Sequence, residues 1–392
     1  MSHKSSPGRS IDGHSLTSPH VRDRLPVQNG SLGVGLGMHY LFQLHADGRA
    51  LESSRSPLAS LPETAKDMDV VASHKELLLC WNSAEETLYV CNPCTQQWIT
   101  PIPPPPVPKV WEEYGYGRNT FGWGFFCEPW YRVGQQGDEF LLNAEFRYRI
   151  FRFERVAGGG QVLQVYSSET CVWNEHALSV RECNWSNVSV EFKGKLHWYN
   201  PPNIVVFDPF NPAERAGFIG RNRPDRLEEG LVADAIRNQR ILFCLGVCRG
   251  CLQLMSLAIS GPQLLLSIWE VEDDEDHHTG KPVLTLNCRL DIKQMLCRDS
   301  CITTTINTLT SFYAVPSGVV RLLAFHPRYK HILYFNISNR LVACNLQTQE
   351  LYVIGRVPIY CQASNVFQLV HPLWPTPLPI PTHPHTPEAP AM

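Results

Sequence analysis

Residues 77–106, LLLCWNSAEETLYVCNPCTQQWITPIPPPP, decide the fold of this chain. The stretch contains two short apolar runs, 77–81 and 88–91, which are rich in β-forming residues and are joined by a polar connector. Because such short runs do not form stable helices, they predict two antiparallel strands. The second strand ends at Asn92, since the proline that follows cannot donate to a ladder, and Trp98 begins a third strand. A three-stranded meander cannot bury both faces alone, so it predicts neighbours of its own kind.

The same order of strand, polar turn, strand and aromatic or apolar restart recurs about five times along the chain. In one copy Thr170 precedes Trp173 by three positions, as Thr95 precedes Trp98. Repeats of about 40–50 residues with four strands each indicate an all-β fold, a β-propeller, and roughly 340 residues at this period predict six or seven blades. A long β-sandwich is the alternative, although its sequence would not need to repeat. The remaining copies lie in residues 190–220, 241–290 and 331–358.

The propeller is expected to form one domain over residues 33–372. Residues 1–32 are rich in Ser, Gly, Pro, His and Arg without apolar periodicity, which predicts a disordered N-terminal arm. Residues 373–392 form a Pro/His-rich tail that is expected to be extended and disordered. No amphipathic helix of 12 or more residues separates the expected strands, which argues against an α/β sheet.

Composition narrows the classes of partner. Hydrophobic residues make up 43% of the 392, which is enough for a sizeable core. A formal net charge of −3 gives no electrostatic reason to expect nucleic acid or an anionic membrane as a partner. No apolar run reaches the roughly 18–20 residues of a membrane span, and the polar N-terminal segment lacks a secretory signal pattern. The fourteen cysteines therefore predict reduced thiols in an intracellular protein of the cytoplasm or nucleus.

Two Cys-x-x-Cys pairs, Cys91 with Cys94 and Cys248 with Cys251, suggest a zinc site. The pairs are about 150 residues apart rather than the usual 12–20 of a zinc ribbon, so buried structural thiols are the preferred interpretation. The acidic run 272–276 lacks the spaced ligands and the glycine of a calcium loop, and it predicts a solvated hairpin loop. We therefore expect no metal ligands and no cofactor-binding residues.

A propeller hydrolase is the enzymatic alternative, with acids such as Asp208, Asp225, Glu228 and Glu229 as candidates. Glycoside hydrolysis needs two carboxyl groups at a defined separation, and the sequence pattern offers no such pair. Neither a G-x-S-x-G motif, a P-loop nor a dinucleotide fingerprint is present. The expectation is a protein without catalytic residues.

Protein binding has better candidates. A loop-rich stretch carries Tyr, Trp and Arg, the residue types that dominate protein interfaces. We therefore predict partner-binding anchors at Tyr114, Tyr116, Arg118, Trp130 and Arg132.

Four segments together resemble the F-box-associated domains of plant F-box proteins, and they occur in that family's order. The segments are residues 77–106, VYSSETCVWNEH at 165–176, VEFKGKLHWYN with IVVFDPF at 190–210, and HILYF with LVACNLQTQELYVIG at 331–355. The resemblance implies a kelch-like β-propeller. It also implies a substrate-recognition role in an SCF-type ubiquitin ligase, with a protein substrate as partner.

Members of that family typically begin with a helical F-box that binds the Skp adaptor and, through it, a cullin. Residues 1–45 do not show its pattern, and the Leu-Pro-Glu at 61–63 leads into residues 68–80, which read as strands. Two roles therefore stay open: the substrate-binding part of the ligase, or an adaptor-free binding scaffold or decoy.

Overall fold

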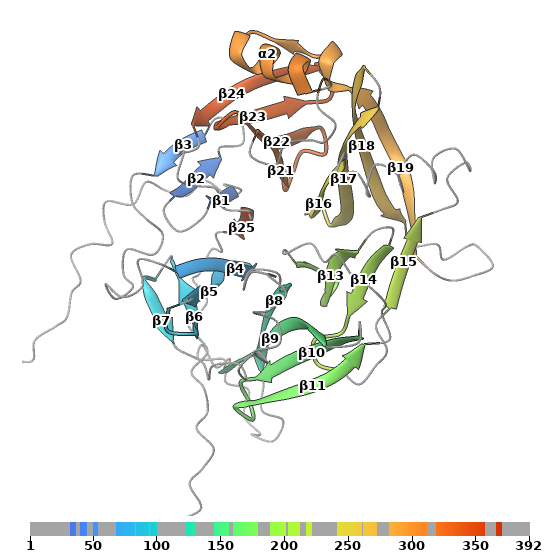
Figure 1. Cartoon of the computed structure of the whole chain (residues 1–392). Helices are drawn as coiled ribbons and strands as arrows, with labels where there is room; N and C mark the ends of the chain where they lie inside the picture. Colours follow the sequence, from blue (N-terminus) through green and yellow to red (C-terminus); the bar gives the residue numbers. More distant parts are fainter. Residues whose placement is uncertain are drawn as a thin grey trace, which may run out of the picture.

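The structure, a computed structural model, is a ring of mainly antiparallel sheets around a central axis (Figure 1). All structural statements concern the residues that it describes. These are residues 32–36, 40–44, 50–53, 68–82, 84–93, 95–99, 122–130, 145–156, 160–178, 189–200, 203–211, 217–221, 241–260, 262–272, 282–309, 311, 319–356 and 366–370.

The strands form five hydrogen-bonded sheets. The first contains β25 (Val366–Val370), β1 (Leu32–Leu36), β2 (Tyr40–Leu44) and β3 (Ala50–Ser53). The second contains β4 (Met68–His74), β5 (Leu77–Asn82), β6 (Thr87–Asn92) and β7 (Gln97–Ile99). The third contains β8 (Trp123–Trp130), β9 (Glu145–Val156), β10 (Gly160–Ser167) and β11 (Val172–Leu178).

The fourth sheet has eight strands, in two groups. These are β12 (Val190–Phe192), β13 (Lys195–Asn200), β14 (Asn203–Phe207) and β15 (Gly217–Arg221), then β19 (Val283–Asp291), β18 (Gln263–Glu272), β17 (Cys251–Ser260) and β16 (Ile241–Cys248). The fifth contains β21 (Val320–Phe325), β22 (Ile332–Ile337), β23 (Arg340–Asn345), β24 (Glu350–Arg356) and β20 (Leu296–Cys297). Two short helices, η4 (Ile292–Gln294) and α2 (Ser300–Leu309), precede the last sheet.

The β-propeller prediction is confirmed. Six or seven blades were expected, and the described strands form five hydrogen-bonded sheets, of which the fourth has eight strands. The fourth sheet arises because the outer strands β15 and β19 pair in parallel, joining two four-stranded meanders edge to edge. That junction is short, with Gly220 opposite Val283 and Arg221 opposite Leu284. The repeating sequence pattern predicts the meanders. It does not predict the two-residue contact between their outer strands.

The ring closes by pairing the two ends of the described chain. Strand β25 is antiparallel to β1, with Leu32 opposite Val370 and Leu36 opposite Val366. The first strands then follow one another around the axis: β25 contacts β4 and β21, β4 contacts β8, and β16 contacts β12 and β21. Closure of this kind removes the open edges that a curved row of sheets would leave exposed.

The repeated turn predicted from the sequence has a common structure. In three of the meanders, the third strand ends at a residue whose side chain caps the four-residue turn that follows. The side-chain oxygen accepts hydrogen bonds from the backbone of that turn, and the capping residues are Asn92, Ser167 and Asn345. The last residue of each turn has positive φ, 58° at Gln96 and 55° at both Cys171 and Gln349. The side-chain cap provides the turn with a fixed geometry.

The two tryptophans of the repeat occupy equivalent positions. Trp98 lies opposite Cys91 and Trp173 lies opposite Tyr166, each one residue after the pair that closes the turn. Trp98 contacts Tyr89 and Trp173 contacts Tyr166 through their rings. The two sequence repeats, Thr95 to Trp98 and Thr170 to Trp173, therefore also have the same strand register.

Neighbouring sheets bury their faces against each other, as the isolated meander required. Trp198 in β13 is fully buried, and its ring meets those of Phe153 and Phe151 in the preceding sheet at 4.7 and 6.3 Å between centroids. Gly124 in β8 permits this contact, because a Cβ there would lie 2.5 Å from Cζ2 of Trp198. Each sheet therefore depends on its neighbours for a core.

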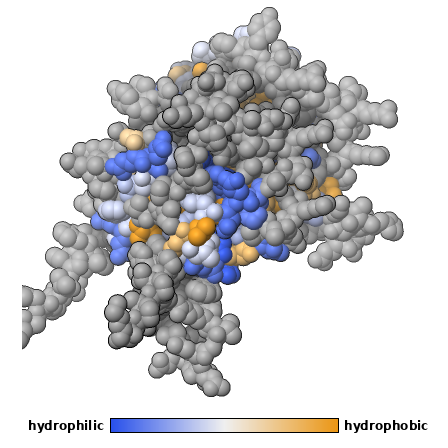
Figure 2. Space-filling view, turned by 60° about the horizontal axis from the view of Figure 1, so that its bottom comes forward, coloured by the Kyte–Doolittle hydropathy of each residue, from blue (hydrophilic) through white to orange (hydrophobic). Residues whose placement is uncertain are grey.

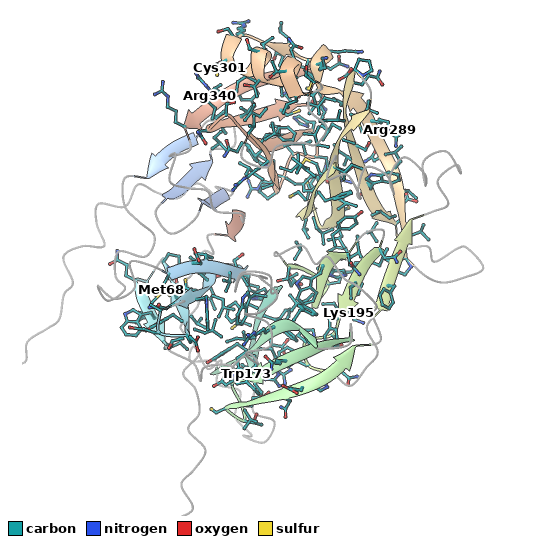
Figure 3. All side chains as sticks on the ribbon, in the orientation of Figure 1. Met68, Trp173, Lys195, Arg289, Cys301 and Arg340 are labelled. Carbon is teal, nitrogen blue, oxygen red and sulfur yellow. The ribbon has the colours of Figure 1, made fainter. Side chains whose placement is uncertain are left out.

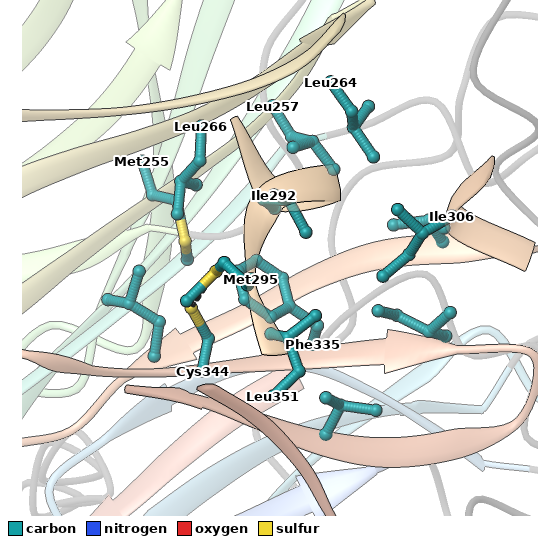
Figure 4. Packing of buried hydrophobic residues seen from close by; sticks show 14 of the residues in the cluster. Met255, Leu257, Leu264, Leu266, Ile292, Met295, Ile306, Phe335, Cys344 and Leu351 are labelled. Atoms are coloured by element: carbon teal, nitrogen blue, oxygen red, sulfur yellow. Dashed lines mark hydrogen bonds between the residues drawn. The ribbon is translucent and has the colours of Figure 1, made fainter. Parts of the chain in front are cut away.

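Helix α2 covers one edge of the interface between the fourth and fifth sheets (Figure 4). Asp299 caps it, since its Oδ1 accepts hydrogen bonds from the backbone N–H groups of Cys301 and Ile302. Ile306 points from the helix into the cluster that contains Met295 and Phe335. The sequence analysis did not predict this helix.

Candidate protein-recognition surface

The ring has two ends that differ in their turns. In every four-stranded meander the first strand, nearest the axis, turns into the second at one end of the ring, which we call the inner-turn end. The described inner turns are residues 75–76, 193–194, 249–250 and 326–331. A hydrogen bond of 2.9 Å from Arg249 N to Pro327 O joins two of them. The opposite end carries the turns between second and third strands, including 84–86 and 338–339.

One of the predicted partner-binding residues lies in a described strand. Trp130 is the last residue of β8, which ends at the inner-turn end. The structure describes only the backbone of Trp130 among the predicted anchors. Tyr114, Tyr116, Arg118 and Arg132 lie outside the described residues.

Exposed charges on the inner turns all have one sign. In the part of the chain that the structure describes, the exposed charged residues of these turns are Lys75, Lys193, Arg249 and Arg328. Lys195 adds a fifth exposed cation beside Lys193, next to β13 in Figure 3. Sequence reasoning missed these residues, although the pairs Lys193-Gly194 and Arg249-Gly250 were a visible signal.

Backbone geometry makes these cations unusual. Lys75, Lys193 and Arg249 have positive φ of 54°, 51° and 51°. Two-residue hairpin turns with positive φ favour Asn, Asp and Gly, because other side chains strain in the left-handed region. At the opposite end, positive φ occurs at Glu86 (52°), Ser338 (49°) and Asn339 (60°), of which only Asn339 is of the favoured type.

Behind the inner turns, a cluster of charged and aromatic residues joins the third and fourth sheets. The guanidinium carbon of Arg147 lies 3.7 Å from the centroid of Phe210, and that of Arg149 lies 4.9 Å from it. Arg147 pairs with Glu128 and Arg149 pairs with Glu169. These acids are therefore neutralised locally and do not cancel the charge of the inner turns.

A second ion pair joins the fourth and fifth sheets at the same end. Lys330 Nζ donates to Glu270 Oε1 at 2.6 Å, and Gln253 and Asn287 donate to Oε2 of the same carboxylate. Burial opposes ionisation of Glu270, but hydrogen bonds from Lys330, Cys251 and Gln253 outweigh it and lower its pKa. Glu270 is thus an anion held by its neighbours.

Three buried histidines support the inner-turn end. His74 Nδ1 accepts the backbone N–H of Cys127 at 3.2 Å, and its ring stacks on Phe126. His326 Nδ1 accepts the N–H groups of the two residues that follow Pro327, at 3.0 and 3.2 Å. Burial lowers the pKa of His74 to about 3 and that of His326 and His197 to about 4. His74 and His326 accept backbone N–H groups as neutral rings, whereas Nδ1 of His197 donates to the carbonyl oxygen of Lys195 at 3.1 Å.

The cysteine pairs have structural positions. Cys248 and Cys251 face each other across the turn of the β16–β17 hairpin as free thiols, and burial raises the pKa of Cys248 to about 11. Cys91 is buried in β6, and Cys94 lies outside the described residues. Within the described ranges, no three His, Cys, Asp or Glu side chains are grouped to hold a metal.

The acidic candidates are similarly placed. Asp208 Oδ1 accepts the backbone N–H groups of Phe210 and Asn211, at 2.9 and 3.1 Å, and so caps the β14–β15 turn as expected. Glu272 ends β18, and the remainder of the acidic run, like Asp225, Glu228 and Glu229, lies outside the described residues.

Figure 2 brings the lower edge of the ring in Figure 1 forward. Hydrophilic residues dominate the coloured surface in this view, and hydrophobic residues appear singly or in small groups. The exposed large hydrophobic residues are scattered: Trp98, Val172, Phe218, Leu286, Leu296 and Tyr329. Charge therefore distinguishes the surfaces of this ring more than hydrophobicity does.

The ring of four-stranded meanders and the turns at its two ends define a β-propeller. A family model described as F-box protein At3g26010-like, beta-propeller, matches residues 148–367. This match covers more than half of the 392 residues, and the chain belongs to that family.

Solved structures match this chain only at low sequence identity and low TM-score. Apo AztD from Citrobacter koseri is 9% identical, with a TM-score of 0.36 over 87% of this chain and 98% of that chain. Prolyl oligopeptidase B from Galerina marginata is 6% identical, with a TM-score of 0.33; the match covers 83% of this chain and spans 42% of the oligopeptidase. The Synechocystis apocarotenoid oxygenase is 8% identical, with a TM-score of 0.33 over 85% of this chain and 78% of that one.

No curated protein matches the sequence. In the part of the chain that the structure describes, no helix has the length and hydrophobicity needed to cross a bilayer.

Proposed function

We propose that the chain is a protein-recognition module that presents a target protein to an SCF-type ubiquitin ligase. The observation that carries this proposal is membership of an F-box protein propeller family across residues 148–367. A rigid ring with many turns at each end suits recognition, because loops on a stable scaffold position binding residues. We place the module in the cytoplasm or nucleus, where such a ligase works.

Co-purification tests the ligase role. The full chain with an affinity tag should retain the Skp adaptor and a cullin when expressed in plant cells, and target ubiquitination should require it. A chain that binds a target without either subunit would instead be an adaptor-free scaffold or decoy.

We also propose that Tyr114, Tyr116, Arg118, Trp130 and Arg132 are partner-binding anchors. One variant set carries Ala at Trp130, the last residue of β8, and at Arg132. A second set carries Ala at Tyr114, Tyr116 and Arg118. Loss of target capture in one set alone, with an unchanged melting temperature, would assign the binding segment.

The eight-stranded sheet bears on the architecture of the module. We propose that its two meanders, β12–β15 and β16–β19, are two blades of a kelch-like ring that share an edge. Counted in this way, each blade keeps the four strands that the repeat requires.

A further inference from the structure

We propose that the inner-turn end binds an extended acidic segment of a partner protein. Lys75, Lys193, Arg249 and Arg328 would face its carboxylates. This inference rests on the proposed recognition function and names the chemistry of the target segment.

Charge complementarity selects the occupant. Four separate blades each place an exposed cation on the turn nearest the axis, and no exposed acid accompanies them on the described inner turns. Acids near the turns are buried or engaged: Glu76 is buried, Glu191 accepts a hydrogen bond from Gly194 N, and Glu270 pairs with Lys330. Arg149 pairs with Glu169, and Arg147 pairs with Glu128. Cations arranged around an axis attract a chain of anions more strongly than single exposed charges do.

Overall charge does not counteract this local attraction. The net charge of −3 is spread over the whole chain. At physiological salt, charges farther apart than about 8 Å are largely screened, so a bound segment responds mainly to the turns that it touches. Of the acidic run 272–276, the structure describes only Glu272, the last residue of the third strand β18.

The choice of residue at these turns points the same way. Lys75, Lys193 and Arg249 occupy left-handed positions at which Asn or Gly would be less strained. Asn339 shows that this chain uses the ordinary residue in a comparable turn. Gln96, Cys171 and Gln349 also occupy left-handed positions, so the strain is shared by other turns of the chain. The property that sets the inner turns apart is the charge of their exposed side chains.

Fluorescence anisotropy with the full chain tests the inference. The probe is a labelled twelve-residue peptide of alternating Glu and Ser, and the reference is the same peptide with Gln in place of Glu. We expect the acidic peptide to bind at least tenfold more tightly, and to weaken at least tenfold between 50 and 500 mM NaCl.

Two variants with equal charge change localise the site. The triple variant Lys75→Asn, Lys193→Asn and Arg249→Asn should lose about tenfold in affinity, from three exposed ion pairs. The control triple variant Arg289→Asn, Arg298→Asn and Arg356→Asn removes three exposed cations elsewhere and should stay within twofold. Arg328→Gln, at a residue without positive φ, should weaken binding about threefold on its own.

Three results would overturn the inference: no preference for the acidic peptide, equal losses in the two triple variants, or equally tight binding of an oligothymidylate of the same net charge. The last would make the end a general polyanion site. These outcomes are independent of adaptor co-purification, so a chain that still retains the Skp adaptor but fails here keeps its proposed function and loses only this inference.

Discussion

The two ends of the ring are built from the same strands but carry different turns. At the inner-turn end, left-handed positions hold Lys75, Lys193 and Arg249, while the comparable turn at the opposite end holds Ser338 and Asn339. Turn geometry favours Asn339 and none of the three cations, and the exposed cations occur only on the inner turns of this comparison. Both sets of residues close hairpins between neighbouring strands, so hairpin formation does not require the positive charge of the inner turns. We attribute that charge to ligand binding.

The buried histidines near the inner turns give the largest expected effect on stability, through the pH dependence of the unfolding free energy. His74, His197 and His326 have pKa values of about 3 to 4, below the ordinary 6.5, so the unfolded chain binds more protons than the folded one in this window. Their stabilisation is full above pH 6.5 and declines as the pH falls towards 4. From pH 7.5 to 5, urea denaturation should show a loss of roughly 2 kcal/mol per histidine, about 6 kcal/mol in all.

A matched variant checks that histidine titration causes the loss. His326→Asn keeps an acceptor for the turn, as Asn345 does in the β23–β24 turn, but cannot titrate. Its pH-dependent loss should be about a third smaller. Equal stability of the parent chain at both pH values would contradict the account.

Packing between sheets gives the next largest expected effect on the unfolding free energy. This effect should not depend on the turns at either end of the ring. Gly124→Ala places a Cβ 2.5 Å from the buried ring of Trp198, which should cost about 2–3 kcal/mol of unfolding free energy. Gly217→Ala is the control, because its Cβ would meet Val206 at an ordinary 3.6 Å. Equal stabilities of the two variants would argue against the tight contact between β8 and β13.

Two ion pairs, one at each end of the ring, allow effects on stability to be distinguished from effects on peptide binding. Lys330 pairs with Glu270 at the inner-turn end, and Arg340 pairs with Asp299 at the other. Both pairs are partly exposed, so replacing either cation by Met should cost about 1 kcal/mol or less. Only Lys330→Met, which leaves Glu270 uncompensated beside the inner turns, should weaken binding of the Glu/Ser peptide, by about threefold. Equal binding losses would remove the distinction between the ends.

The smallest expected effect concerns the turns themselves. Lys193→Asn should raise the unfolding free energy by about 0.5–1 kcal/mol, and Asn339→Lys should lower it by a similar amount, because Asn tolerates the left-handed conformation better. Thermal denaturation of both single variants measures this. A destabilised Lys193→Asn variant would mean that the lysine serves the fold and needs no ligand to explain it.

Much of the fold was predictable because it repeats. The spacing of Thr95 to Trp98 and of Thr170 to Trp173 corresponds to one turn geometry and one strand register. Local patterns carry this information, since each turn is specified by residues next to it in the sequence.

Other features depend on contacts that no local pattern reports. The pairing of β1 with β25 and the parallel junction of β15 with β19 join distant segments. Helix α2, SCITTTINTL, was missed because its β-branched threonines favour strands, although Asp299 as a cap and buried Ile302 and Ile306 were available as signals. The cluster of inner-turn cations was not predicted, because each cation lies in a separate short turn of the sequence. Only the closed ring places these turns at one end of the molecule.

Hydrogen–deuterium exchange of the full chain, with and without saturating Glu/Ser peptide, tests the central difference between the two ends most directly. The account predicts slower exchange in peptides that cover turns 75–76, 193–194 and 249–250, and no change in those that cover 84–86 and 338–339. Protection confined to the second group, or no protection at either end, would contradict it.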